Sequence, residues 1–199
     1  YWVCCISRTR ESSMSTDYRA ISVFNEEMLG KDRASRMSQV SMYADTAHFV
    51  YEILQNADDA GASEVVFEVS EDGLVIEHNG KPFTSDDVKA ISYFGKGKTD
   101  ITKIGHFGLG FKSVFAYTAS PRIHSGSESF EITDLYTLRT VPLPADLRRN
   151  RTSLRFDGRQ MEGPDTIYEK RDRLSKEVGN FSSSPQVVKR VVFWSSTSL

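Results

Sequence analysis

The stretch that decides the fold runs from Ala44 to Ala60 and reads ADTAHFVYEILQNADDA. Apolar residues recur along it three and four positions apart, at Ala47, Val50, Tyr51, Leu54 and Ala57. This spacing is that of an amphipathic helix with one apolar face. Gly61 follows directly and is the residue type that most often ends a helix. We therefore predict an amphipathic helix over residues 44–60.

The same helix carries a polar stripe beside its apolar face. Glu52 and Asn56 are four residues apart and Asp59 follows three residues later, so the three side chains share one face. If this face lines a cavity, the Glu52 carboxylate can orient and deprotonate a water molecule. The Asn56 amide oxygen can then complete the coordination of a Mg²⁺ that also holds waters and phosphate oxygens. The alternative is a solvated helix face, which is the commoner case for an isolated Glu/Asn pair.

The residues after this helix predict a β-hairpin and a second helix. EVVFEVS and LVIEHN are rich in β-branched residues and are separated by EDG, which is typical of an antiparallel hairpin. In PFTSDDVKAI, Thr84 followed by Asp87 resembles a capping box, so a short helix is expected toward Ile91. The polar, glycine-containing SYFGKGKTDITK predicts a mobile loop.

Beyond this loop the sequence predicts one short buried helix, FKSVFAYT, and four strands. The strand-like runs are RIHS, SFEIT, LYTLRT and TSLRF. Helices and strands do not alternate strictly, which favours an α+β layered fold over parallel α/β units. The residues after Asp157 give a weaker signal, and the apolar end of the chain has no predicted place.

A second motif, IGHFGLGFKS at residues 104–113, comes close to a phosphate-binding P-loop but does not fit one. A P-loop follows a strand and places Lys directly after its last glycine. Here a polar loop precedes the motif and Phe111 fills the lysine position. What remains is a glycine-rich turn leading into a helix N-terminus, whose free N–H groups can hold an anion. Close packing of the backbone is the alternative interpretation.

Length and composition fit one domain with tails. The chain has 199 residues, 39% of them hydrophobic, and a formal net charge of −2, so no overall basic field favours nucleic acid. Adjacent Cys4 and Cys5 are the only cysteines, which fits a reducing, intracellular compartment, cytoplasmic or nuclear. No apolar run approaches the roughly 20 residues that a membrane helix needs, so no membrane partner is expected.

Three motifs in register resemble those of a known superfamily. YEILQNADDAGA, HNGKPF and IGHFGLGFKSVF resemble the N, G1 and G2 boxes of the GHKL (Bergerat-fold) ATPases, and the chain is most similar to sacsin-type and related Hsp90-like ATPase domains. The resemblance covers residues 38–157. It implies a two-layer α/β sandwich, with helices over one face of a mostly antiparallel sheet and ATP bound between helices and a lid.

The resemblance also implies roles for single residues. Glu52 matches the general base, Asn56 the Mg²⁺ ligand and Asp59 a polar residue that borders the nucleotide pocket. Gly80 matches the first G1 glycine, and Thr152 a threonine that bonds the adenine region. The G2 box contributes glycines that let backbone approach the phosphates and two packing residues, at Gly105, Gly108, Gly110, Phe107 and Phe111.

Three lysines are further candidates for contacts with phosphate. Residues 93–103 take the place of the ATP lid, in which Lys96 and Lys98 could meet the γ-phosphate on closure. Lys112 could touch phosphate or point to solvent. Charged residues of a loop are most often solvated, and that alternative stays open for all three.

Two departures from the superfamily pattern affect the expected chemistry. His78 stands where the G1 box has an aspartate that accepts a hydrogen bond from the adenine amino group. A neutral imidazole could accept that bond, and we expect adenine binding to fade below about pH 6.5 as His78 is protonated. A histidine at a strand end bonded to backbone is the alternative. Chaperone-like members also take a basic residue from a following domain, so hydrolysis by this chain alone should be slow or absent.

The expected function is ATP binding, with Mg²⁺-dependent hydrolysis and a lid that couples nucleotide state to partner domains or protein clients, as in chaperones. A pseudo-ATPase interaction module is the alternative. A DNA-linked ATPase of the MutL type is a third, and it rests on Arg148, Arg149, Arg151 and Arg155 alone; nucleic acid is thus not a favoured partner. The expected organisation is a flexible leader (1–18), the ATPase domain (19–160) and a C-terminal segment (161–199).

Overall fold

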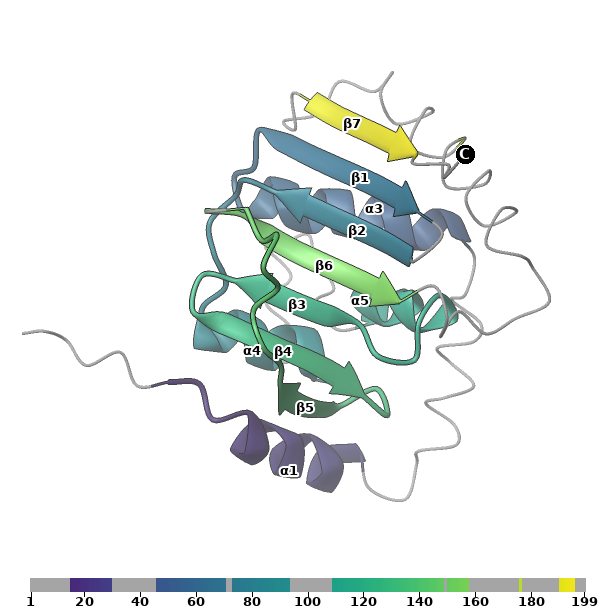
Figure 1. The fold of residues 1–199 in the computed structure, drawn as a ribbon. Helices are drawn as coiled ribbons and strands as arrows, with labels where there is room; N and C mark the ends of the chain where they lie inside the picture. Colours follow the sequence, from purple (N-terminus) through teal and green to yellow (C-terminus); the bar gives the residue numbers. More distant parts are fainter. Residues whose placement is uncertain are drawn as a thin grey trace, which may run out of the picture.

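Seven strands form one sheet in the order β5-β4-β3-β6-β2-β1-β7 (Figure 1). The computed structural model describes residues 15–29, 46–70, 73–93, 109–148, 150–157, 176 and 190–195. Neighbouring strands are antiparallel except β1 and β7, which are parallel. The strands are β1 (Glu64–Ser70), β2 (Gly73–His78), β3 (Arg122–Ser125), β4 (Glu128–Thr133), β5 (Thr137–Thr140), β6 (Thr152–Asp157) and β7 (Arg190–Ser195).

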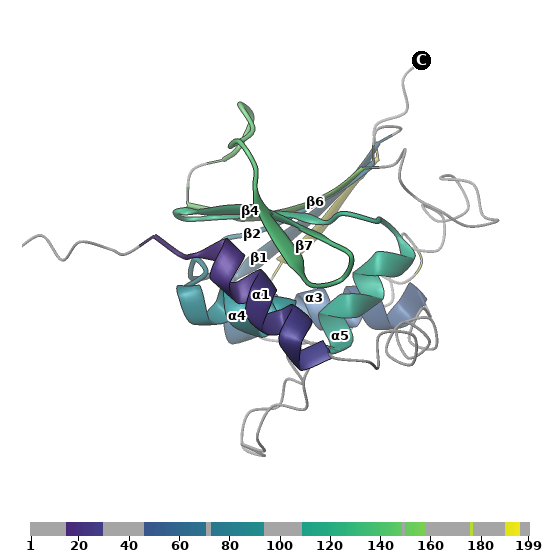
Figure 2. The ribbon, with the colours of Figure 1, turned by 90° about the horizontal axis from the view of Figure 1, so that it is seen from below.

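The described helices lie on one side of this sheet (Figure 2). They are α1 (Tyr18–Leu29), α3 (Thr46–Asp59), α4 (Ser85–Ser92) and α5 (Leu109–Lys112), which continues as the 3₁₀ helix η2 (Ser113–Ala116). The predicted α+β class is therefore confirmed, together with the hairpin, the two predicted helices before and after it, and the short buried helix. None of the helices in the described ranges is long and apolar enough to span a bilayer.

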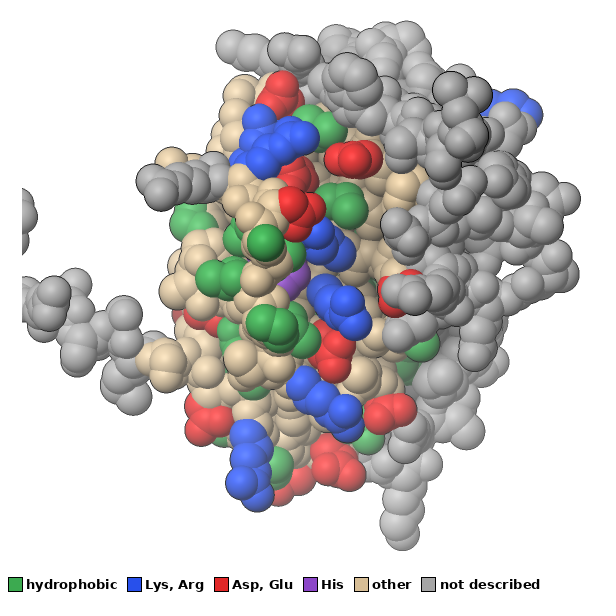
Figure 3. All heavy atoms as spheres, viewed as in Figure 1, with side chains coloured by type: hydrophobic (Ala, Val, Ile, Leu, Met, Phe, Trp, Pro, Cys, Tyr) green, Lys and Arg blue, Asp and Glu red, His purple; other side chains and the backbone are tan. Residues whose placement is uncertain are grey.

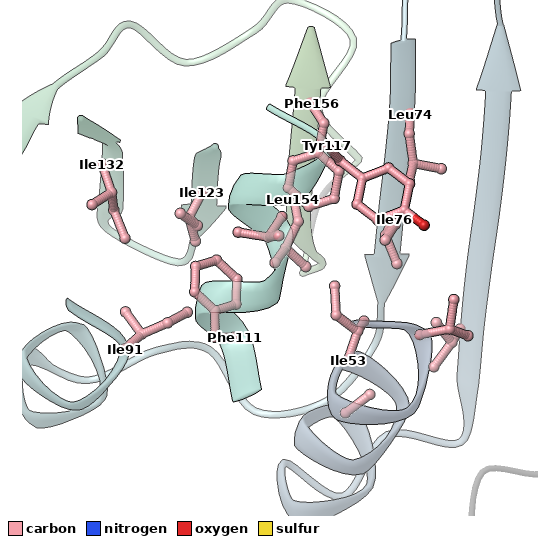
Figure 4. Close-up of a cluster of buried hydrophobic side chains, with 14 of the residues drawn as sticks. Ile53, Leu74, Ile76, Ile91, Phe111, Tyr117, Ile123, Ile132, Leu154 and Phe156 are labelled. Carbon is pink, nitrogen blue, oxygen red and sulfur yellow. The ribbon is translucent and has the colours of Figure 1, made fainter. Parts of the chain in front are cut away.

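The core is built from aligned rows of apolar side chains on the helix-covered face of the sheet. Phe67, Ile76, Leu154, Ile123 and Phe130 are paired in turn across β1, β2, β6, β3 and β4, and each is buried. Because alternate residues of a strand point to opposite faces, such rows form where register and sequence agree. Figure 4 shows Ile53 of α3, Ile91 of α4 and Phe111 of α5 directed at these strands.

The ends of α3 and α4 follow from the residues that the sequence places there. Gly61 has φ +71°, and its N–H donates to Asp58 O at 2.7 Å while Ala62 N–H donates to Ala57 O at 2.9 Å. This pair of bonds is a Schellman motif, which requires the left-handed conformation that glycine tolerates. At the start of α4, the Thr84 and Asp87 side chains form the predicted capping box. Both signals fix the course of the chain around α3 and α4.

Two elements were not predicted from the sequence. α1 packs against β5, where Leu138 N–H donates to Ser22 Oγ at 2.8 Å, and Tyr18 OH donates to Glu128 Oε2 at 2.7 Å. β7 extends the sheet at β1, so the apolar end of the chain, left without a place above, supplies an edge strand. The domain boundaries at residues 18 and 160 stay predictions.

Candidate functional site

A cavity of about 240 Å³ lies between α3, the segment 81–84, α4 and α5. Glu52, Asn56 and Asp59 of α3 all line it, so the predicted polar stripe borders a cavity. Glu52 and Asn56 are half-buried there, whereas Asp59 is exposed. Phe111, the residue that breaks the P-loop pattern, lines the same cavity from α5 and is 3% exposed. Lys81, Pro82 and Phe83 of HNGKPF also line it, so the structure brings together residues from all three motifs that the sequence singled out.

The segment between β2 and α4 forms the wall opposite the polar stripe. Lys81 N–H donates to Ala60 O at 2.9 Å, and Phe83 N–H donates to Ser125 Oγ at 2.8 Å. A Cβ at Gly80 would lie 2.8 Å from Ala60 Cβ and 3.0 Å from Ala60 O. Gly80, which was assigned to the G1 box, therefore permits a close approach of this segment to the end of α3.

Gly80→Ala should destabilise the fold by about 1–3 kcal/mol, because the added methyl group overpacks a contact with helix backbone. For a chain of this size the melting temperature should fall by roughly 3–9 °C. Thermal unfolding followed by circular dichroism measures the change. Ser127→Ala, in the exposed β3–β4 turn, is the control and should leave the melting temperature within 1–2 °C of the unsubstituted protein, as about 0.5 kcal/mol allows; equal melting temperatures for both variants would contradict the packing argument.

Several residues of the cavity wall were not predicted. Lys81, Thr84 and Asp87 add polar groups, and Ile91 adds an apolar one. The signal for Thr84 and Asp87 was present, since the capping box was read correctly as a helix start. What the sequence could not show is that this helix begins beside α3, because that depends on how the segment 81–84 crosses the end of the sheet.

A polar row lies on the helix-covered face at one end of the sheet. His78, Thr152 and Ser125 are paired in turn across β2, β6 and β3, and all three are buried. Ser125 Oγ and Thr152 Oγ1 are 2.5 Å apart. Two predicted adenine-region residues, His78 and Thr152, are therefore cross-strand neighbours next to the segment that lines the cavity.

His78 is held as a neutral ring. Burial, together with the positive charge of Arg151, lowers its pKa to about 4. Its Nδ1 accepts a hydrogen bond from Gly80 N–H at 3.2 Å, so the proton of the neutral ring is assigned to Nε2, which is then a donor. The expected titration near pH 6.5 is wrong, because a buried imidazole resists protonation. The bond to backbone agrees with the alternative role given for this histidine.

Acid should destabilise the protein through His78. The pKa of His78 is about 4 in the folded state and near 6.5 when unfolded, so the unfolded state binds more protons between these values. The contribution is full above pH 6.5 and falls as the pH approaches 4, by about 2 kcal/mol at pH 5. Chemical denaturation at pH 7 and pH 5 measures it. His78→Gln should lose less stability over this range than the unsubstituted protein, and an identical loss would contradict the assignment.

Lys112 lies in neither of the two predicted places. It is 0% exposed, and its Nζ donates to Ser92 O at 3.1 Å and to Leu135 O at 2.5 Å. A contact with phosphate and a solvent-exposed position are both contradicted, because the ammonium is enclosed between α4, α5 and the β4–β5 turn. Lys96, Lys98, Gly105, Phe107 and Gly108 lie outside the described residues, and Gly110 belongs to α5.

A larger hollow of about 520 Å³ lies between α1 and α4. It is lined mainly by apolar residues, including Ile21, Phe24 and Tyr93. The polar groups among its lining side chains are those of Asn25 and Lys89 and the hydroxyl of Tyr93. They include no carboxylate, so we place the candidate site in the smaller cavity. Within the described ranges, no group of three or more His, Cys, Asp or Glu side chains could hold a metal ion alone.

The arginine run is paired with carboxylates of the same chain. Arg148 Nε lies 3.4 Å from Glu77 Oε2 and Arg155 NH2 lies 3.1 Å from Asp146 Oδ2. Arg151 is paired with Glu64, and Arg149 lies outside the described residues. Figure 3 shows both signs of charge interspersed on the open face of the sheet. The pairing weakens the one sequence observation behind the DNA-linked alternative.

Comparison with known proteins gives a family and two relatives. Residues 32–139 match the family described as Sacsin domain. Protein NO VEIN of Arabidopsis thaliana is 33% identical over 58% of this chain, which is 5% of that protein. Sacsin of Homo sapiens is 33% identical over 49% of this chain, which is 2% of that protein. The chain therefore spans a small part of the length of both relatives.

Proposed function

Because the chain belongs to the Sacsin domain family, we propose that it is an ATP-binding domain of the Hsp90-like (GHKL) type. The proposed fold is the Bergerat sandwich, and the proposed reaction is Mg²⁺-dependent hydrolysis of ATP to ADP and phosphate. One observation carries the proposal: Glu52, Asn56, Asp59 and Phe111, selected from separate motifs, line a single cavity. Three of these residues lie on α3 and the fourth lies on α5, so the arrangement depends on the packing of these two helices beside one another.

The layer arrangement supports the same proposal. Helices cover one face of a mostly antiparallel sheet (Figure 2), and the cavity lies between the helix layer and the segment 81–84. α5 begins at Leu109, directly after Gly108 in the sequence, and contains Gly110. Phe111 of the same helix lines the cavity.

The polar groups of the cavity fit a magnesium nucleotide. Asn56 offers an amide oxygen and Glu52 a carboxylate, the oxygen ligands and bases that Mg²⁺ sites use. A single protein ligand suffices for Mg²⁺ when phosphates and waters fill the other positions, so a cluster of three carboxylates is not required. Lys81 adds a cation to the lining of the same cavity. A bound Mg²⁺ would supply charge neutralisation on the phosphate oxygens.

The proposed mechanism assigns the proton transfer to Glu52. Its carboxylate would orient a water molecule and accept its proton as the water oxygen bonds to the γ-phosphorus, while the bond from that phosphorus to the bridging oxygen breaks and ADP leaves. Asn56, one turn further along α3, would hold the metal on the same helix face as that carboxylate. The apolar side chains of Ile91 and Phe111 limit the access of bulk water to the reacting groups.

Recognition of the base should differ from that of an aspartate-based site. Nε2 of neutral His78 is a donor, whereas an aspartate accepts. Thr152 and Ser125 hydroxyls complete the polar row beside it. We therefore expect adenine affinity to stay constant between pH 8 and pH 5.5 as far as His78 is concerned, since its pKa is about 4.

The cellular setting is proposed on the same basis. The family relation favours a chaperone-like role, in which nucleotide state is passed to partner domains or protein clients in the cytoplasm or nucleus. Isothermal titration calorimetry with Mg²⁺-ATP, Mg²⁺-ADP and Mg²⁺-GTP tests the central claim. Saturable binding of ATP and ADP with one site per chain supports it, and the absence of heat for every nucleotide would overturn it.

A further inference from the structure

Lys112 is a buried charge for which the proposed mechanism has no use. Two backbone carbonyls, Ser92 O and Leu135 O, accept hydrogen bonds from its ammonium. The ring of Phe115 lies 5.7 Å from Nζ. Lysine is almost never fully buried unless it is paired, because removing an ammonium from water is costly. The complete burial of Lys112 therefore indicates a role that depends on these partners.

The bond between Lys112 and Ser92 joins two walls of the cavity. Ile91 lines the cavity from α4 and Phe111 lines it from α5. Ser92 and Lys112 are the residues that directly follow these two. The bond spans 20 positions in the sequence. It therefore fixes the end of α4 relative to α5, and with them the separation of the two apolar wall residues.

The other contacts anchor this junction to the rest of the fold. Asn25 of α1 is 1% exposed, and its Nδ2 donates to Ser92 Oγ at 3.2 Å and to Tyr136 O at 3.3 Å. Leu135 has φ +72°, a left-handed conformation that is strained for a residue with a side chain and persists only when its surroundings hold it. The bond from Lys112 to Leu135 O is one such restraint.

We infer that Lys112 is a positioning residue for the proposed nucleotide cavity, holding its α4 and α5 walls at the separation that a bound nucleotide requires. The inference rests on the proposed function. The location suits a cation, because the carbonyls of the last turn carry the negative end of the α4 dipole. A charged donor also makes stronger hydrogen bonds than a neutral one. Loss of the charge should loosen the junction while the core stays packed.

Protonation of Lys112 gives the inference a distinctive readout. Burial lowers its pKa to about 7, so the side chain changes charge in an accessible range. The carbonyls of Ser92 and Leu135 and the ring of Phe115 face the ammonium. The charged residues of the elements packed here are exposed: Arg19, Glu26 and Glu27 of α1, Asp86, Asp87 and Lys89 of α4, and Asp134 of the β4–β5 turn.

The test compares Lys112→Met with Lys89→Met, which removes an exposed lysine paired with Asp86 on α4. Calorimetry with Mg²⁺-ADP, a ligand that is not hydrolysed, gives the dissociation constant at pH 6 and pH 8.5. At pH 6 the Lys112→Met variant should bind about tenfold more weakly than the unsubstituted protein, as for loss of charge-assisted bonds. At pH 8.5 the difference should shrink to about twofold or less, because Lys112 of the unsubstituted protein is then neutral both with and without nucleotide. Lys89→Met should match the unsubstituted protein at both pH values.

Two further measurements separate this inference from the proposed function. Hydrogen exchange without nucleotide should be faster in residues 88–93 and 109–116 of Lys112→Met. In the unsubstituted protein, Mg²⁺-ADP should raise the pKa of Lys112 measured by NMR, because binding and protonation are linked; this measurement needs no variant to fold. No ADP binding by the unsubstituted protein overturns the proposed function. Binding that is unaffected by Lys112→Met, with an unchanged Lys112 pKa, overturns the inference alone.

Discussion

Asn56→Ala should weaken the binding of Mg²⁺-ATP by about 100-fold, the largest effect on affinity expected of any single substitution in the cavity. The amide oxygen of Asn56 is the proposed protein ligand of Mg²⁺, and even residues that only support a metal ligand change metal affinity by about 10–100-fold. Alanine keeps α3 intact, because it is the best helix former. Calorimetry at a fixed excess of Mg²⁺ measures the change.

The control for this experiment is Gln55→Ala, at the adjacent position of α3. Gln55 is not part of the described cavity wall, so its replacement should leave the affinity for Mg²⁺-ATP within about twofold, as for a substitution away from the site. The same titration without Mg²⁺ adds a second check. Because the role of Asn56 depends on the metal, the variant and the unsubstituted protein should then bind ATP equally weakly. A 100-fold loss that persists without Mg²⁺ would contradict the assignment.

Glu52→Gln should abolish ATP hydrolysis while nucleotide binding is kept. Glutamine has the shape of glutamate but cannot accept the proton of the attacking water, and general bases contribute about 10²–10⁴-fold to a rate. The dissociation constant for Mg²⁺-ATP should change by less than about threefold, because the metal ligand and the apolar walls are unaltered. Phosphate release measured over hours detects even slow turnover.

Turnover in the unsubstituted protein is the reference for this result. Glu68→Gln, at an exposed position on β1, is the matched control and should hydrolyse ATP at the unsubstituted rate. Equal phosphate release by Glu52→Gln and Glu68→Gln would remove Glu52 from the mechanism and leave the binding site untouched. Preserved binding with lost turnover would separate the roles of Glu52 and Asn56 on α3.

Local signals in the sequence predicted most of the elements around the cavity. The three-and-four spacing of α3, the glycine at its end and the capping box of α4 depend on neighbouring residues only, and all three are present. The short helix that holds Phe111 was predicted in the same way. The polar stripe on α3 was recognised because helical geometry alone places Glu52, Asn56 and Asp59 on one face.

Contacts between distant parts of the chain could not be predicted in this way. α1 has Ile21, Phe24 and Met28 at helical spacing, but no element was predicted for residues 19–29, because the partner of such a short helix lies far away in the sequence. β7 pairs with β1 across more than a hundred residues, and no local pattern reports such a pairing. The burial of Lys112 and His78 likewise depends on which elements surround them, and burial decides the protonation of both.

The position of β6 in the sheet determines how much of the chain is needed for folding. The family match ends at residue 139, whereas β6 begins at Thr152 and lies between β3 and β2. A fragment cut at the end of the match would lose the strand that joins the two halves of the sheet and would expose two unpaired edges in its middle. The part of the chain that folds as one stable unit must therefore extend beyond the segment that matches the family.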